Sequence, residues 1–115
     1  MRPSEFQKYL ERDLHCPHCG KSDETLIPGH RHSRGMGGSK ARNNHANILV
    51  MCSEINGLLE SDPVWMETGK RFGWRLNSWE DAEIAPIYDV STGQWSHLDN
   101  NLGRYPLISL DDVLE

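Results

Sequence analysis

The segment from Asn47 to Cys52 carries a continuous apolar run with polar residues on both sides. Such a run predicts a buried strand. An earlier strand is expected to start within residues 25–28 and to end within residues 29–32. Between the two, residues 33–39 contain too many glycines for a regular element, which predicts a broad loop. The pattern therefore predicts two strands that are joined by a loop.

Three helices are predicted around these strands. The residues from Ser4 to Gln7 read as a capping box that opens a helix ending near Leu14. Ser53 is the expected N-cap of a helix that breaks at Asp62, because the residue before a proline disfavours the helical conformation. A third helix is expected over residues 63–72. The apolar residues expected to face inward are Phe6, Leu10 and Leu14 in the first helix and Ile55, Leu58 and Leu59 in the second.

The pattern changes after Trp74. Residues 85–90 and 94–98 flank a short turn with a glycine, which predicts a β-hairpin, and residues 106–108 are expected to pair again. A chain of 115 residues fits a single domain. Within it, residues 1–75 form the predicted core and residues 76–115 an accessory hairpin extension. The predicted fold class is α+β.

Composition restricts the class of protein. The hydrophobic content of 37% is low for a core of this size, so a metal or a partner is expected to contribute to stability. No apolar run approaches the ~20 residues of a membrane span. The N-terminus lacks the apolar stretch of a signal peptide. We therefore expect a cytoplasmic protein that does not bind membranes.

The charge is unevenly distributed. The formal net charge of −5 is not typical of a nucleic-acid binder. However, one stretch without acidic residues carries a charge of +4, which leaves −9 for the rest of the chain. A local basic loop on an acidic body predicts a weak, salt-sensitive contact with a phosphate backbone. The basic residues of this stretch are Arg31, Arg34, Lys40 and Arg42.

The chain has three cysteines, Cys16, Cys19 and Cys52. An odd number with a Cys-x-x-Cys pair argues against a disulfide scaffold and for a metal site or free thiols. A redox pair is the alternative for Cys16 and Cys19, and a small buried residue is the alternative for Cys52. A closed zinc site needs four ligands, and His15 or His18 is the candidate for the fourth.

A second group of polar residues suits the hydrolysis of a phosphodiester. That reaction needs a base with a pKa near the working pH, which favours a histidine such as His30. It also needs a cation that stabilises the charge on the phosphate. Asn56 and Glu60 are spaced i, i+4 on the predicted second helix, so both side-chain oxygens can face one point.

The segment 30–62 resembles the HNH (His-Asn-His, ββα-metal or His-Me finger) endonuclease superfamily, in particular small phage-type members of the His-Asn-Asn variety. The resemblance implies a ββα-metal core with a partial zinc knuckle. The segments that carry it run from His30 to Ser39 with the pair Gly37-Gly38, from Asn47 to Ser53, and from Asn56 to Asp62.

The resemblance also implies a role for each residue. His30 stands seven and eight residues before the glycine pair, as the general base does in such families. Asn47 corresponds to the asparagine that braces the loop carrying the base. Asn56 corresponds to the third motif residue, and with Glu60 it would hold a divalent ion. Mg or Mn is expected there, with Zn or Ni as alternatives.

The implied activity is metal-dependent endonucleolytic cleavage of DNA. Its phosphates would be bound by Arg31, Arg34, Lys40 and Arg42. DNA is the expected partner, with a homodimer or another protein as alternatives. If the chain is encoded by a phage, it would act in the host cytoplasm.

The sequence departs from the family pattern at two positions. Gly29 stands where the family usually places an Asp or His metal ligand, so His32 is considered as a substitute ligand. Ile55 stands where a second Cys-x-x-Cys pair would end. These departures motivate a second hypothesis, a catalytically inactive HNH-derived module that binds DNA or protein, for example a phage regulatory or inhibitory protein.

Overall fold

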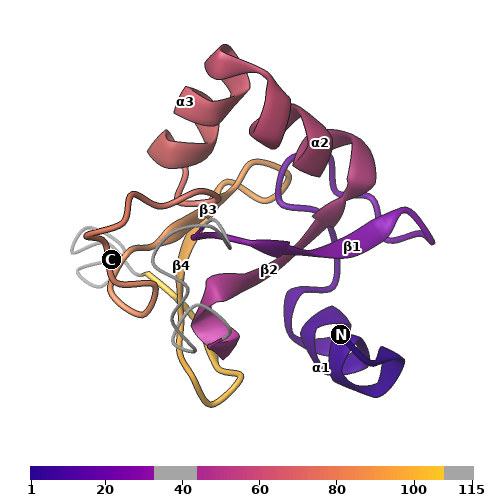
Figure 1. Cartoon of the computed structure of the whole chain (residues 1–115). Coiled ribbons are helices and arrows are strands. Elements are labelled where there is room, and N and C mark those ends of the chain that lie inside the picture. The colour runs from indigo at the N-terminus through magenta and orange to yellow at the C-terminus, as the bar shows by residue number, and fades with distance from the viewer. Residues whose placement is uncertain (33–43, 108–115) are drawn as a thin grey trace.

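A computed structural model of the chain describes residues 1–32 and 44–107 (Figure 1). Within them, helices and two antiparallel sheets form a small α+β fold, as the sequence predicted. The predicted loop over residues 33–39, with Gly37 and Gly38, lies outside the described residues. The elements are α1 (Pro3–Asp13), β1 (Leu26–His30), the short 3-10 helix η2 (His45–Asn47), β2 (Ile48–Cys52), α2 (Ser53–Ser61), α3 (Pro63–Arg71), β3 (Ile87–Asp89), β4 (Gln94–Leu98) and β5 (Arg104–Pro106).

The strands β1 and β2 form the centre of the molecule. They pair antiparallel, with Leu26 opposite Cys52 and His30 opposite Ile48. Every residue of β2 is buried, because α1 packs against the pair on one side and α2 on the other. The predicted strand is confirmed, except that Asn47 lies in η2 rather than in β2. The register places His30 at one end of the pair and Cys52 at the other.

The helix α1 differs from its prediction at both ends. Its N-cap is Arg2, which makes no side-chain cap hydrogen bond, so the predicted capping box does not form. Pro3 opens the helix instead, since proline has the helical φ and no N–H to satisfy. Leu14 was predicted to face inward, and this prediction is wrong. It is the C-cap with φ 68° and is 64% exposed.

Asp13 fixes α1 to the rest of the fold. Its buried carboxylate accepts a hydrogen bond from the Val50 N–H at 3.0 Å, which ties α1 to β2. It also pairs with Arg12 at 2.7 Å and with Arg104 of β5 at 3.0 Å. Two cationic partners and a backbone donor compensate the desolvation of this carboxylate. The inward face of α1 is therefore partly ionic, which an apolar pattern does not reveal.

The helices α2 and α3 meet at Asp62, where the sequence predicted a break. Asp62 is the N-cap of α3, and its side chain accepts hydrogen bonds from the N–H groups of Val64 and Trp65. The predicted N-cap of α2 is shifted by one residue, since Cys52 rather than Ser53 holds that position. The break turns the chain back, so that α3 packs against α2 (Figure 1).

A turn at Gly73 connects α3 to the second sheet. Gly73 has φ +76°, and a Cβ there would lie 1.9 Å from the carbonyl oxygen of Pro86, so only glycine fits. The next residue, Trp74, is fully buried and donates from its indole N–H to the Tyr88 carbonyl at 2.8 Å. The turn therefore places the start of β3 directly against the end of α3.

The second sheet has the strand order β3-β4-β5. The predicted hairpin is confirmed, with Asp89 opposite Gln94 beside the turn. The expected third pairing is formed by Arg104–Pro106 rather than residues 106–108, and Ile108 lies outside the described residues. Within residues 1–32 and 44–107, no helix has the length and apolarity that a membrane span requires.

Arg31 joins the β1–β2 pair to the segment between α3 and the second sheet. Its side chain is fully buried, and burial lowers the pKa of the guanidinium to about 10. The guanidinium donates to four backbone carbonyls, at 2.7 to 3.0 Å. Two of the acceptors, Ala82 and Ala85, lie beyond residue 75, so these bonds cross the predicted boundary between core and extension. The other two acceptors are Ala46 and Gly73.

An Arg31→Met variant should therefore lose much of its stability. The substitution removes the guanidinium donors from four carbonyl oxygens, and a buried polar group left unsatisfied costs about 1–3 kcal/mol. We expect the free energy of unfolding, measured with urea, to fall by at least about 3 kcal/mol. The matched control is Arg71→Met, because Arg71 is exposed at the end of α3. Equal urea midpoints for the two variants would contradict the bracing role of Arg31.

A candidate catalytic cleft and a cysteine cluster

A cleft of about 610 Å³ opens beside the end of β1 and is bounded by α2 and α3. Gly29 and His30 line it from β1, and Asn56 and Glu60 line it from α2. The i, i+4 spacing places Asn56 and Glu60 one helical turn apart on the same face of α2. The fold therefore brings three of the residues predicted from the sequence, His30, Asn56 and Glu60, to one cleft.

Asn47 holds the chain that follows His30. Its backbone oxygen accepts a hydrogen bond from the Arg31 N–H at 2.8 Å, and its side-chain oxygen accepts one from the His32 N–H at 2.7 Å. Asn47 is only 1% exposed, so water does not compete for these bonds. Asn47 therefore fixes the backbone of the two residues that follow His30.

His32 lies outside the cleft. Its Nδ1 is 3.1 Å from the Asn47 side-chain oxygen, and its Nε2 is 3.1 Å from the Asn77 carbonyl oxygen. The ring is 5% exposed and lines a separate, smaller cavity. Both ring nitrogens therefore have partners outside the cleft, and His32 does not line the cleft beside Gly29.

A side chain at position 29 would be crowded by its neighbours. A Cβ added at Gly29 would lie 3.0 Å from Asn56 Oδ1 and 3.1 Å from the Leu49 carbonyl oxygen. Both distances are shorter than ordinary van der Waals contact. With Gly29 in place, the Asn56 oxygen can approach the backbone of β1, so Asn56 occupies part of the space that an Asp or His side chain would use.

One lysine and one arginine contribute positive charge to the cleft, and neither was predicted from the sequence. Lys70 lines it from α3, and Arg75 lines it from the segment after α3. Arg75 Nη2 donates to Asn56 Oδ1 at 2.8 Å and lies 4.0 Å from Glu60 Oε1. Burial lowers the pKa of Arg75, and the nearby Glu60 carboxylate opposes that shift. The only signal in the sequence was the position of Arg75 between Trp74 and an apolar neighbour.

The predicted phosphate-binding residues need one correction. Arg31 is fully buried and its guanidinium is used by four backbone carbonyls, so it does not reach a phosphate. The other three, Arg34, Lys40 and Arg42, lie outside the described residues. Besides the buried Arg31, the basic residues that line the cleft in the described part of the chain are His30, Lys70 and Arg75.

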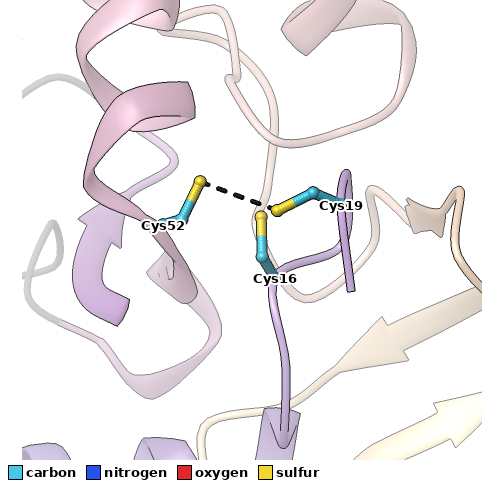
Figure 2. A group of neighbouring side chains, drawn as sticks. All are labelled: Cys16, Cys19 and Cys52. Carbon is cyan, nitrogen blue, oxygen red and sulfur yellow. Dashed lines mark hydrogen bonds between the residues drawn. The ribbon is translucent and has the colours of Figure 1, made fainter. Parts of the chain in front are cut away.

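The three cysteines gather at the other end of the β1–β2 pair. Cys16 and Cys19 come from the turn after α1, and Cys52 stands at the start of α2 (Figure 2). Their sulfur atoms lie within 4.8 Å of one another, and Cys19 Sγ is 3.7 Å from Cys52 Sγ. Thiolates on a tetrahedral zinc with 2.3 Å bonds stand about 3.8 Å apart. The cluster can therefore hold a metal such as zinc.

The cysteines differ in their surroundings. Burial raises the pKa of Cys16 to about 11. Burial raises the pKa of Cys19, but the hydrogen bond from the Lys21 N–H and the hydrogen bonds shared with Cys16 and Cys52 outweigh it and lower the pKa of that thiol. Cys19 is exposed, whereas Cys16 and Cys52 are buried. Cys19 is therefore the thiol of the cluster that is accessible to solvent.

Neither histidine considered as a fourth ligand belongs to the cluster. His15 Nε2 lies 2.6 Å from Asp89 Oδ2, which ties the turn to β3. His18 packs edge-on against Trp65 and Trp74. Ile55 is buried in α2 and offers no ligand atom. Among residues 1–32 and 44–107, no other group of three or more His, Cys, Asp or Glu side chains gathers in this way.

The comparisons with known proteins assign no family to the chain: no family model matches it, and no curated protein or solved structure matches it either.

Proposed function

We propose that the protein is a metal-dependent endonuclease of the HNH type that hydrolyses DNA phosphodiesters. The observation that carries the proposal is the cleft in which His30 meets Asn56 and Glu60 beside two cations. The order β1, β2, α2 supports it, because a ββα-metal core has this order and presents its base and its ligands from these elements. The proposal explains why residues far apart in the sequence share one cleft.

In this proposal His30 is the general base. Its imidazole lines the cleft and would accept a proton from the attacking water. Asn47 keeps the backbone after His30 in place through the bonds to Arg31 and His32. Lys70 contributes a positive charge that attracts the DNA phosphate.

Asn56 and Glu60 would hold a divalent ion. An amide oxygen and a carboxylate are hard ligands, and Mg²⁺ takes one or two protein carboxylates together with waters and substrate phosphates. The position between these two side chains also suits a cation, because the guanidinium of Arg75 already lies there. When bound, the ion would stabilise the negative charge on the phosphate and on the leaving oxygen.

A plasmid assay tests the proposal. We expect supercoiled plasmid to be nicked in the presence of Mn²⁺ or Mg²⁺ and to stay intact in EDTA. Asn56→Ala should slow nicking by at least about tenfold, because one of the two ligands is lost. Asn101→Ala is the matched control, since Asn101 is exposed in the turn before β5. Nicking that persists in EDTA, or that is equal in the two variants, would contradict the proposal.

A second candidate function is an HNH-derived module that binds DNA or protein without cleaving it. Two observations favour it. Gly29 supplies no ligand atom, and Arg75 donates a hydrogen bond to the side-chain oxygen of Asn56. Metal stoichiometry separates the two candidates. One ion per chain that is lost in Asn56→Ala supports the enzyme, whereas tight DNA binding without an ion at this cleft supports the module.

A further inference from the structure

Arg75 occupies the point to which Asn56 and Glu60 converge. Its Nη2 lies 2.8 Å from Asn56 Oδ1 and 4.0 Å from Glu60 Oε1. The side chain of Arg75 is 13% exposed, whereas that of Glu60 is 68% exposed. The guanidinium is therefore the inner partner of the pair, and Glu60 reaches toward it from the rim of the cleft.

The backbone of Arg75 is fixed, and its largely buried side chain borders the cleft. Its N–H donates to the Gly69 carbonyl at 3.1 Å, and its neighbours Trp74 and Leu76 are buried. The guanidinium itself is bound through the Asn56 amide and, from Nη1, the Trp74 carbonyl at 3.1 Å. Because Arg75 lines the cleft, the cleft offers space into which the guanidinium could turn while the backbone stays in place.

We propose that Arg75 is an internal counter-cation that competes with the divalent ion for Asn56 and Glu60. The inference rests on the proposed function, in which these two residues hold that ion. Two positive groups in contact with the same oxygens repel each other, so the ion and the guanidinium weaken each other's binding, and the ion is expected to displace the guanidinium. The displaced guanidinium then lies in the cleft, where a phosphate is the ligand that its planar fork suits best.

Binding of Mn²⁺ without DNA tests this competition. Free Mn²⁺ is measured by electron paramagnetic resonance in a titration of the zinc-loaded protein. We expect Arg75→Met to bind Mn²⁺ about tenfold more tightly than the unchanged protein, within the range usual for two coupled ligands. Lys70→Met is the matched control, because it removes a positive charge from the same cleft without freeing Asn56. Its Mn²⁺ affinity should change less than about twofold.

A double variant identifies the site at which the gain arises. In Asn56→Ala/Arg75→Met the tenfold gain should disappear, because the oxygen for which the two cations compete is absent. Equal or weaker Mn²⁺ binding by Arg75→Met, a gain that survives without Asn56, or an equal gain in Lys70→Met would each overturn the proposal, provided that circular dichroism shows a native fold. The titration contains no DNA, so its outcome is separate from that of the cleavage assay.

Discussion

The His30→Ala variant is expected to nick supercoiled plasmid about 10²–10⁴ times more slowly than the unchanged protein at saturating Mn²⁺. This factor is what a positioned general base contributes to a reaction. Among the described residues, His30 is the one histidine that lines the cleft, so no other described histidine replaces it there. Initial rates of nicking, measured over a range of enzyme concentrations, give the factor.

His97→Ala is the matched control for this experiment. His97 lies on β4 in the second sheet, and its Nδ1 has no hydrogen-bond partner among the described residues. Removing that ring should leave the rate of nicking unchanged within about twofold. Undiminished nicking by a His30→Ala preparation that is free of other nucleases and folded by circular dichroism would rule out His30 as the base.

The second large effect is a loss of thermal stability when one cysteine of the Cys16, Cys19 and Cys52 cluster is replaced. We expect the protein to contain one zinc per chain by native mass spectrometry and Cys19→Ser to lose it. A structural zinc contributes roughly 10–16 kcal/mol of apparent binding free energy in small metal-binding domains, and much of it is folding free energy. Even a quarter of that amount would lower the Tm of a chain of this size by more than about 10 °C.

Cys19 is the informative cysteine because its side chain is exposed. A serine there removes a ligand but does not open a cavity in the core, as a change at Cys16 or Cys52 would. Ser22→Ala in the same segment is the control and should keep both the zinc and the Tm. A Cys19→Ser protein with an unchanged Tm would show that the cluster is not a stabilising metal site.

The elements around the cleft could be predicted from the sequence where local pattern determines structure. Residues close together in the sequence determine both the buried strand β2 and the helix break at Asp62, and both predictions are confirmed. The boundaries were less accurate. Pro3 displaced the predicted capping box, and Cys52 took the place predicted for Ser53 as N-cap.

The contacts of the long cationic side chains could not be predicted in the same way. Arg31 appeared as a basic loop residue, yet its partners are carbonyls 15 to 54 residues away in the sequence. Arg75 meets Asn56 across 19 residues. A local sequence pattern predicts the helix, strand or loop in which such an arginine lies. It does not predict which distant backbone or amide oxygen accepts a hydrogen bond from the guanidinium.

The bonds of Arg31 also set an order of events during synthesis of the chain. The Ala85 carbonyl follows Arg31 by 54 residues, which takes roughly 3–11 s to translate. Until then the guanidinium beside His30 has not gained all its acceptors and stays hydrated. Synthesis therefore has to pass Ala85 before the guanidinium next to the strand that carries His30 can gain its last acceptor.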